Sequence, residues 1–489
     1  MSSLYRRSGL GPPQREAAHF ISSKEADRYL FESVVEINKA HVVMLQRNGV
    51  VSRKHVRKIL RALAQLRSMP SSSRAEDVHA AIEEAVTRRA GKVAGGNLQL
   101  AKSRNDQVAT AIRMRLRGET LRIMDLLIDT FAEIQSKIKK HCKTLVIGRT
   151  HLQPAEPVTY GHYLMATHDA MLRDLQRLEE FYARLNLSPM GACALAGTSI
   201  PIDRRLVATL LGFDGIVENS LDAAGSRDFA LEFLAHMTQL AINISRLAED
   251  FVFYLTPEVG QLQLPKSLSF ASSIMPQKKN PDIIELVRAK CAIPIGAFSQ
   301  AATILHSLPT SYNLDLQEIT PSIWDSSAAM EDVIGILRTV LSQTIVSPVQ
   351  PDAAGLALIT ATEIANMLVT DLGVPFRLAH QIVASAAVEL SESKSIETGL
   401  WRQLILKKTR EALGNRSKKL ESRLDSVMDP AAVVAKKRSI GCPAPKETLR
   451  LLRKRTVNLS RILKRQSVRR GRLAMAKRRL CSEVTHLRA

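Results

Sequence analysis

Residues 106–142 read DQVATAIRMRLRGETLRIMDLLIDTFAEIQSKIKKHC, and their apolar side chains recur at intervals of three and four. This spacing places the apolar side chains on one face of a helix longer than most helices of globular proteins. They are Val108, Ile112, Met114, Leu121, Met124, Leu127, Ile128, Phe131 and Ile134. Similar segments occupy residues 156–186, 226–255 and 281–305. Such faces are buried by packing against one another, so we expect a central helix bundle.

The composition favours an all-α protein made of three helical units. The chain has 489 residues, of which 45% are hydrophobic and 4% aromatic, while Leu, Ala, Arg, Lys and Glu are plentiful. Such a composition favours helix and disfavours an all-β fold. We expect an N-terminal helical domain (1–105), the long central bundle (106–350), a C-terminal helical domain (351–450) and a basic extension (451–489).

The cysteines and the hydropathy indicate a cytoplasmic protein. Five widely separated cysteines form no CxxC pair, which predicts neither a disulfide framework nor a zinc site. The first residues lack the apolar stretch of a secretion signal, and no run of about 18 apolar residues occurs, so we expect no membrane span. The sequence has no HExxH, GxxxxGK or EF-hand motif. We therefore expect no metal and no cofactor.

Positive charge is concentrated near the end of the sequence. The formal net charge is +22, and residues 450–489 hold 14 Lys or Arg against one acid, Glu483. The apolar face of a basic helix would consist of Leu452, Val457, Ile462 and Leu463. A solvated, partly disordered extension is the alternative. In both cases we expect non-specific contact with polyanions, and we expect removal of residues 464–489 to leave activity and assembly intact.

The segment SSIMPQKKNPD, residues 272–282, has the composition of an anion-binding loop. It places two hydroxyls, two ammonium groups and an amide together. Asn280 is a favoured N-cap residue, Pro281 suits the first helical position, and Asp282 is an acid in the first turn. We therefore predict a helix from Ile283 whose positive end lies beside these groups. The alternative is a polar turn before an ordinary helix.

Residues 272–282 resemble the signature loop of the aspartase/fumarase superfamily, and the Gln-Lys-Lys variant resembles its argininosuccinate lyase form. Further matches fall in the family's order over residues 20–450. They are SRNDQ at 103–107, THLQ at 150–153, ALAGT at 194–198, NSLD with SRDF at 219–229, and YN with QE at 312–318. Several ordered matches are far more specific than any one tetrapeptide.

The resemblance implies an all-α fold with a long central bundle, four subunits assembled into a homotetramer, and active sites shared between subunits. It also implies β-elimination of argininosuccinate to arginine and fumarate, a step of arginine biosynthesis that needs no cofactor. Three other functions compete with this one. They are another fumarate-releasing lyase of the superfamily, a non-catalytic structural protein such as the lens crystallins related to this family, and nucleic-acid binding through the basic segment. That segment has no aromatic residue for stacking on bases.

An elimination beside a carboxylate needs a base and fixed positive partners for the carbanion. By the resemblance, Ser272 is the base, and Lys278 and Asn280 stabilise the doubly charged intermediate. Ser273 is the alternative serine and a substrate contact. A serine hydroxyl is a poor base unless its anion is stabilised, so this assignment requires a nearby cation.

His151 is the second catalytic candidate. A single histidine is more often a packing or capping residue, and the THLQ context raises its interest. In the family this histidine pairs with a glutamate on the helix after the signature loop, which is Glu285 here. The pair would tune proton transfer to the leaving amine, and the residues leave open whether His151 itself is the acid.

The resemblance also implies a set of substrate contacts. Ser103, Arg104 and Asn105 lie at the start of the long helix, where an anion is welcome, and Arg104 suits a bidentate carboxylate contact. A capped helix with a surface arginine is the alternative. Ser23 with Asp27 matches a motif that grips the amino-acid end of the substrate. Further contacts are Thr150, Ser273, Asn280, Tyr312 and Gln317.

The sequence departs from the family pattern at three places. Ala271 stands where the family usually has glycine, which would restrict the loop if φ there must be positive. Residues 99–102 read QLAK in place of HTGR. The family commonly has Asp-Lys after Gln-Glu, and this chain has threonine, Thr320, at the lysine position. Arg227 or Lys266 could supply the missing cation.

Overall fold

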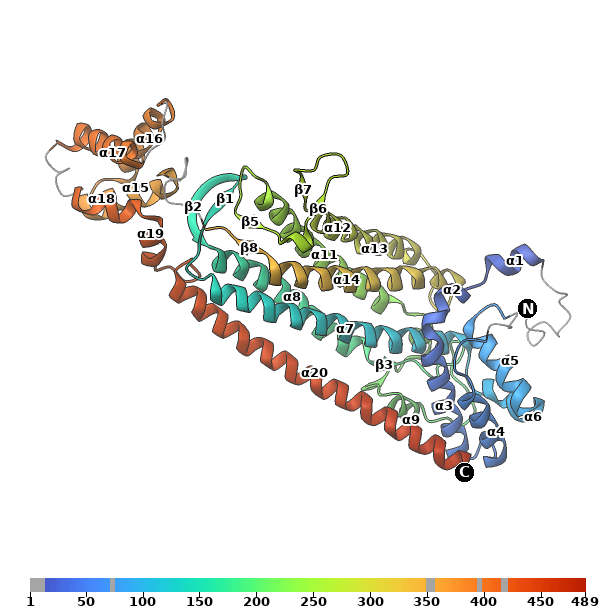
Figure 1. Ribbon diagram of the computed structural model, residues 1–489. Coiled ribbons are helices and arrows are strands. Elements are labelled where there is room, and N and C mark those ends of the chain that lie inside the picture. The colour runs from blue at the N-terminus through green and yellow to red at the C-terminus, as the bar shows by residue number, and fades with distance from the viewer. Residues whose placement is uncertain (1–13, 71–74, 349–356, 394–397, 415–420) are drawn as a thin grey trace.

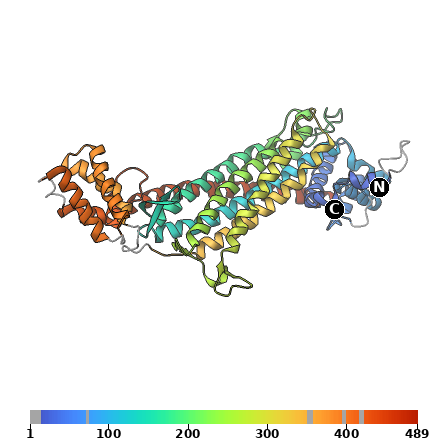
Figure 2. The same ribbon diagram turned by 90° about the horizontal axis from the view of Figure 1, so that it is seen from above.

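The computed structural model describes residues 14–70, 75–348, 357–393, 398–414 and 421–489. The molecule is elongated, with a small helical part at each end of a long helix bundle (Figures 1 and 2). Helices dominate, and the strands form four short two-stranded sheets among the described residues. The prediction of an all-α fold with a long central bundle is confirmed.

The N-terminal part consists of short helices, most of which bury one face, whereas the first of them has no buried residue. These are α1 (Arg15–Phe20), α2 (Lys24–Asp27), η1 (Arg28–Leu30), α3 (Phe31–Arg47), α4 (Arg53–Ala64), α5 (Val78–Ala90), α6 (Lys92–Gly95) and η2 (Gly96–Gln99). Side-chain caps fix two of the starts: Ser52 accepts from the amide of His55, and Asp77 accepts from the amide of Ala80. This part shares the main core, in which Ile37 and Ile59 are fully buried.

The central bundle contains the long helices that the periodicity predicted. Its helices are α7 (Arg104–Lys140), α8 (Tyr160–Leu185), α11 (Asp228–Leu255), α12 (Asp282–Lys290), α13 (Ala292–Leu305) and α14 (Ile319–Gln343). Phe131 of α7, Phe181 of α8 and Phe233 of α11 are buried in one core. Shorter elements, α9 (Arg204–Leu210) and α10 (Ser220–Gly225), connect α8 to α11.

Two predicted helix boundaries were wrong. The helix expected over residues 281–305 is two helices, α12 and α13, because Pro294 has no amide to bond the carbonyl of Lys290 and so cannot continue the first helix. The helix expected from residue 156 begins at Tyr160, because Pro157 lies in a strand and disfavours helix at the residue before it.

The short sheets hold loops at the bundle surface. β1 (Leu145–Thr150) pairs antiparallel with β2 (Gln153–Thr159), with a bulge between Gly148 and Arg149. β6 (Phe270–Ala271) pairs antiparallel with β7 (Lys279–Asn280). The other pairs are β3 (Leu187–Ser188) with β4 (Gly215–Ile216), and β5 (Leu262–Gln263) with β8 (Ile345–Val346). The β1–β2 and β6–β7 turns carry predicted catalytic residues.

The C-terminal helical part has a core of its own around the fully buried Trp401. It consists of η5 (Ala357–Thr360), α15 (Ala361–Leu372), α16 (Phe376–Ser391), α17 (Thr398–Leu413), α18 (Glu421–Met428) and α19 (Pro430–Lys436). An ion pair from Lys437 to Glu156 joins it to strand β2. The part therefore contacts the bundle at the β1–β2 hairpin (Figure 1).

The basic segment is a long helix that packs along the bundle. Helix α20 (Pro445–Arg488) passes residue 450 without a break and runs from the C-terminal part to the N-terminal part (Figure 1). Its buried positions are Thr448, Leu452, Leu459, Ile462, Gln466, Leu480, Val484 and Leu487. Of the two readings of this segment, the amphipathic helix is confirmed and the partly disordered extension was wrong, because this face covers apolar surface of α3, α4, α7, α8 and α9.

The apolar face of α20 also differs from the predicted one. Leu452 and Ile462 are buried as expected, whereas Val457 is 53% exposed and Leu463 is 42% exposed. Leu459 takes the intervening buried position. On the inner side, Arg455 forms a bidentate pair with Asp169 at 2.7 and 2.8 Å. The helix is thus fixed by both apolar and charged contacts.

Candidate active site

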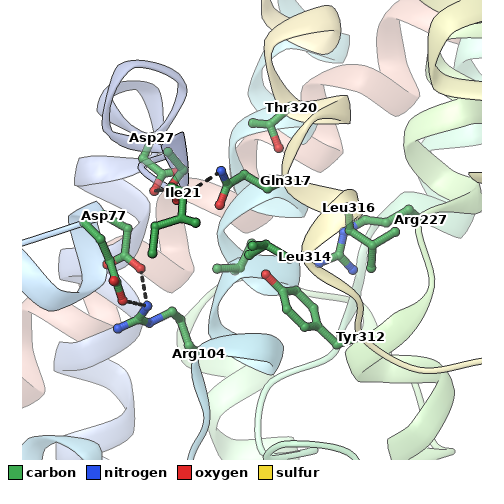
Figure 3. A pocket seen from close by; sticks show the side chains of 13 residues that line it. Ile21, Asp27, Asp77, Arg104, Arg227, Tyr312, Leu314, Leu316, Gln317 and Thr320 are labelled. Carbon is green, nitrogen blue, oxygen red and sulfur yellow. Dashed lines mark hydrogen bonds and ion pairs between the residues drawn. The ribbon is translucent and has the colours of Figure 1, made fainter. Parts of the chain in front are cut away.

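The predicted site residues fall into three groups on the single chain. One group lines a pocket beside the N-terminal part, a second lies on the β6–β7 loop with the start of α12, and a third lies on the turn between β1 and β2. The N-terminal pocket has a volume of about 100 Å³. Its lining is Ile21, Ser23, Asp27, Glu76, Asp77, Arg104, Val108, Arg227, Tyr312, Leu314, Leu316, Gln317 and Thr320 (Figure 3).

One wall of the N-terminal pocket is acidic. Ser23, which precedes α2, donates its hydroxyl to Oδ2 of Asp27 at 2.6 Å. Burial raises the pKa of Asp27 to about 6, and the Ser23 hydrogen bond opposes that rise by stabilising the carboxylate. The amide of Ser23 donates to the carbonyl of Glu76, which ties this wall to the start of α5. A carboxylate held in this way can receive a cationic ligand.

Arg104 crosses the pocket floor from the start of α7 to the acids before α5. Its Nη1 lies 2.5 Å from Oε1 of Glu76 and 2.8 Å from Oδ2 of Asp77. Ser103 is the N-cap of α7: its hydroxyl accepts from the amide of Asn105 and its own amide donates to Asp106. Figure 3 shows the Arg104 side chain in the pocket with its ion pairs, so it is not an unpaired surface arginine.

Asp106 connects the start of α7 to the segment that includes ALAGT. Its Oδ2 accepts from the amides of Gly191 and Cys193 at 2.9 and 2.8 Å. Asn105 donates its side-chain amide to the carbonyl of Ala194 at 3.2 Å. Burial raises the pKa of Asp106 to about 6. The segment that includes ALAGT is therefore positioned directly by the helix that carries Arg104.

Tyr312 and Gln317 form the opposite wall. Gln317 ends η4 (Leu314–Gln317) and donates to the carbonyl of Ile21 at 3.4 Å. A Cβ atom on Gly225 would lie 2.6 Å from Cα of Ser311, so the end of α10 and the Tyr312 loop touch through their backbones. Glycine is required at this close approach. Burial raises the pKa of Tyr312, so its hydroxyl is a neutral donor.

The structure separates the two candidates for the missing cation. Arg227 precedes α11 and lines the N-terminal pocket together with Thr320. Lys266 lies on η3 (Lys266–Leu268), between β5 and β6. Two further lining residues, Glu76 and Asp77, were not predicted as site residues. They reach the site because the start of α7 lies beside the residues that precede α5, which no local signal indicates.

The signature loop is an exposed hairpin closed by β6 and β7. The amide of Ser272 donates to the carbonyl of Lys278 at 3.4 Å, and the hydroxyl of Ser272 accepts from the amide of Met275 at 3.1 Å. Ser273 and Lys278 are exposed. Ser272 and Lys278 are thus held opposite each other at the base of the loop, with the serine hydroxyl kept close to its own turn.

Two expectations about this loop change. Asn280 is not the N-cap of α12: it pairs with Phe270 in the hairpin, and the cap position is Pro281. Ala271 is also in a strand, paired with Lys279, a conformation open to any residue. Its replacement of glycine therefore imposes no strain.

Lys278, Asn280 and Glu285 line a second cavity of about 420 Å³ between the loop and the end of α11. We call it the loop cavity. Lys279 and Ser269 also line it, and its other residues are mostly apolar. The cavity combines two ammonium groups and an amide with one carboxylate, which suits a ligand that carries more than one negative charge.

Thr150 and His151 lie at the tip of the β1–β2 hairpin. His151 and Leu152 both have positive φ, 55° and 62°, although neither is glycine. Such left-handed residues are unfavourable and cluster at functional sites. Both Thr150 and His151 are exposed, and in the described part of the chain no hydrogen bond or ion pair joins His151 to Glu285. The single chain therefore does not bring the expected pair together.

Within the described ranges, no group of three or more His, Cys, Asp or Glu side chains is placed to hold a metal ion. No helix in those ranges is both long enough and apolar enough to cross a membrane.

Comparison with protein families finds matches over most of the chain. Residues 19–296 match a lyase family model, and residues 358–435 match the model of the argininosuccinate lyase C-terminal domain. Among curated proteins, the argininosuccinate lyase of Methanothrix thermoacetophila is 40% identical over 98% of each chain. That of Methanosarcina barkeri is 37% identical over 96% of this chain and 95% of its own.

These relatives also correct the reading of the basic segment. An alignment over 98% of the chain includes most of α20, so this helix lies within the family match and not beyond residue 450.

Solved structures agree with the sequence comparison. The chain of EDDS lyase in complex with formate superposes with a TM-score of 0.84 at 27% identity, covering 98% of this chain and 97% of that one. A class II fumarase from Schistosoma mansoni has a TM-score of 0.68 at 17% identity, covering 82% of this chain and 90% of its own, which shows the shared fold. The chain belongs to the argininosuccinate lyase family.

Proposed function

We propose that this protein cleaves argininosuccinate to arginine and fumarate. A base removes the proton from the carbon beside a carboxylate of the succinyl portion. The electron pair forms the new C=C bond, the C–N bond breaks, and the nitrogen of arginine takes up a proton. Atoms and electrons balance without an oxidant or a cofactor. The reaction would serve arginine biosynthesis, the route in which the named relatives' activity produces arginine.

The observation that carries this proposal is the pairing of Ser272 with Lys278 across the base of one hairpin. The amide-to-carbonyl contact between them keeps a hydroxyl and an ammonium group on the same short turn. We assign Ser272 as the base, with Lys278 and Asn280 as the groups that stabilise the charged intermediate. Ser273, next in the chain, serves as a substrate contact in this assignment.

We assign the two ends of the substrate to different residues. Ser23, Asp27, Tyr312 and Gln317 would bind the arginine portion, because they line one small pocket with a carboxylate on its wall. The start of α7 and the tip of the β1–β2 hairpin would bind the succinyl carboxylates. These residues are Ser103, Arg104, Asn105 and Thr150. A helix start and an arginine both favour anionic groups.

We propose that assembly into a homotetramer completes the site. His151 and Glu285 would then meet across subunits and tune proton transfer to the leaving nitrogen. Supporting this, the bundle exposes large apolar side chains along neighbouring helices. They are Ile242 on α11, Leu286 on α12, Ile293 and Ile295 on α13, and Ile336 on α14. A large exposed apolar surface is typical of subunit interfaces.

The reaction is tested by following fumarate absorbance with purified protein. We expect turnover of argininosuccinate and little or none of adenylosuccinate, aspartate or malate. Preferential release of fumarate from one of the other three would reassign the protein to a different lyase of the superfamily. Folded protein without turnover of any of the four would support a structural role.

Shared sites are tested by mixing two inactive variants, Ser272→Ala and His151→Asn. If the loop and the hairpin of one site come from different copies, mixed oligomers contain some sites with both native residues and regain activity. Light scattering gives the mass of the mixture. A tetrameric mixture that stays inactive would contradict sharing between these two elements.

We also propose a weak, non-specific contact of the outer face of α20 with polyanions. Arg453, Lys454, Arg461, Lys464, Arg478 and Arg479 are exposed on α20. They have no ion-pair partner in the described part of the chain. Neutralising Arg461 and Lys464 should lower the salt needed to elute the protein from heparin, because fewer counterions are released on binding. Unchanged elution would contradict this proposal.

We also propose a cytoplasmic location, because the five cysteines are free.

A further inference from the structure

A buried arginine on the wall of the N-terminal pocket has unused hydrogen-bonding capacity. Arg227 is 3% exposed, and its Nη1 donates to the carbonyls of Ser226 at 2.7 Å and Ala224 at 3.4 Å. Its Nε and Nη2 have no hydrogen-bond partner among the described residues. Burial lowers the pKa of Arg227 to about 10, so the group is still charged at neutral pH. An unpaired buried cation is unfavourable unless a ligand completes it.

The guanidinium of Arg227 faces the pocket. Arg227 lines it with Tyr312 and Leu316, and Figure 3 shows its nitrogen atoms directed toward this side. The backbone contact between Gly225 and Ser311 fixes the loops that carry Arg227 and Tyr312 against each other. The second arginine of the pocket, Arg104, is already paired with acids. Arg227 therefore has two covered nitrogens beside the pocket that lack a hydrogen-bond partner among the described residues.

The pocket has opposite charges on two walls. Asp27, oriented by Ser23, provides a carboxylate, and Arg227 provides a guanidinium. A ligand with an ammonium and a carboxylate on one carbon matches both walls. Such a group is the α-amino-acid end of arginine and of argininosuccinate. A carboxylate is also the anion for which a guanidinium is best suited, since it can accept two parallel hydrogen bonds.

We propose that Arg227 binds the α-carboxylate of the arginine portion of the substrate, with Asp27 receiving the α-ammonium group. The proposal rests on the proposed function for the identity of the ligand. It assigns Arg227 to recognition of the unreacting end of the substrate and leaves the chemistry to the signature loop. Arg227 is then a specificity-determining residue.

The test compares L-arginine with L-argininamide, which has a carboxamide in place of the α-carboxylate. Binding of each to the full protein is measured by calorimetry, so the result does not depend on turnover. We expect the wild type to prefer arginine by about 10- to 100-fold, the range for a charge-assisted contact of this kind. In Arg227→Met the preference should fall to about onefold to threefold, because the partner of the carboxylate is gone.

Two further variants keep the result interpretable if Arg227→Met loses stability. Arg113→Met is the matched control, since Arg113 is 5% exposed, stacks on Phe229 and does not line the pocket. It should keep the preference for arginine. Adding Thr320→Lys to Arg227→Met places a cation on the same pocket and should restore the preference.

An arginine preference that is unchanged in folded Arg227→Met would overturn the proposal. The proposed reaction has a separate test. It would be contradicted if the wild-type protein released no fumarate from argininosuccinate. A wild type that turns over argininosuccinate but binds arginine and argininamide equally would retain the function and reject the role of Arg227.

Discussion

The signature loop and helix α20 differ in how much they contact the rest of the molecule. The loop residues between Ser272 and Lys278 contact mainly one another, through backbone bonds within the hairpin, and most are exposed. Helix α20 contacts α3, α4, α7, α8 and α9 and has buried residues along its whole length. The proposed chemistry lies in the first region, and much of the stabilising surface lies in the second.

From this contrast we expect rate and stability to be governed by separate residues in this chain. A substitution in the loop should change turnover and leave the free energy of unfolding almost unchanged. A change on the inner face of α20 should do the reverse. The N-terminal pocket is the intermediate case, because Asp27 is buried and also lines the pocket that we propose binds substrate.

The largest expected effect is that of deleting residues 464–489. The deletion removes three buried apolar side chains, Leu480, Val484 and Leu487, and the contacts of Gln466 with Asp125. At about 2 kcal/mol per buried side chain, the loss of unfolding free energy is about 6 kcal/mol. We therefore no longer expect this deletion to leave activity and assembly intact. Urea denaturation measures the loss of unfolding free energy.

Substitution of the exposed Arg461 and Lys464 by alanine is the matched control for this deletion. Surface changes of this kind alter unfolding free energy by about 0.5 kcal/mol or less. A truncated chain with the denaturation midpoint of the wild type would show that α20 is not part of the stabilising core.

Ser272→Ala should have the largest effect on rate. Removal of a general base lowers kcat by about 1,000-fold, within the range for such groups. The thermal midpoint should stay within about 1 °C, since the side chain contacts only its own turn. Steady-state kinetics and calorimetry check both parts. Near-normal turnover would transfer the role of base to Ser273 or elsewhere.

Lys278→Met should lower kcat by about 100-fold, by analogy with the loss of one donor to a developing negative charge. The unfolding free energy should again be almost unchanged, because Lys278 is exposed. An increase in KM with constant kcat would identify Lys278 as a binding contact of equal strength in ground and transition states. Lys279→Met, at the adjacent exposed position, is the comparison variant.

The pH dependence of kcat/KM tests the role of Asp27 in the N-terminal pocket. The pKa of Asp27 is raised to about 6, so lowering the pH through 6 protonates the carboxylate and removes the proposed partner of the substrate ammonium group. We expect kcat/KM to fall about tenfold per pH unit below that value. Asp27→Asn should lower kcat/KM at pH 7.5 and abolish this step.

The free energy of unfolding should change with pH in the opposite direction to kcat/KM over the same range. Between the ordinary value of 3.8 and about 6, the folded chain keeps the Asp27 proton that the unfolded chain releases. The free energy of unfolding therefore falls as the pH rises through this interval. An Asp27→Asn variant that kept the acid step in kcat/KM would assign the step to another group, such as Asp106.

The smallest predicted effects concern two alanines at positions where the family has glycine. Ala101 has φ of 56°, where an L side chain is strained, so Ala101→Gly should stabilise the protein by about 1 kcal/mol. Ala271 lies in strand β6, so Ala271→Gly should destabilise by about 0.5 kcal/mol. Urea denaturation measures both free energies of unfolding. If both substitutions stabilised the protein, or both destabilised it, the backbone conformations described for the two alanines would be contradicted.

The sequence predicted the long helices well because their signals are local. Helix α7 has apolar residues at a regular period and a Ser103–Asp106 capping box, and both are visible in the sequence. The break at Cys291 was missed because the apolar pattern continues past Pro294. The tight turn at His151 was missed because it contains neither asparagine nor glycine, the residues that normally mark such hairpins.

The sequence predicted the residues of the candidate site as separate motifs, but it did not predict how they meet in space. The resemblance placed Ser23, Asp27 and Gln317 in one set, and the structure brings them to one pocket. No local pattern indicated that Glu76 would contact Arg104, since that contact depends on the start of α7 lying beside the residues that precede α5. The inner face of α20 was also hidden, because its arginines look alike in sequence and differ only in which acids lie opposite them.

The position of α20 in the chain has a consequence for synthesis. Its inner cations pair with acids that are made much earlier: Arg455 with Asp169, Arg465 with Glu179, and Arg470 with Asp125. During translation the bundle helices emerge first, with these carboxylates uncompensated and the apolar groove between them open to water. The groove closes only when residues 445–488 leave the ribosome. The nascent bundle therefore stays incomplete until α20 has been made.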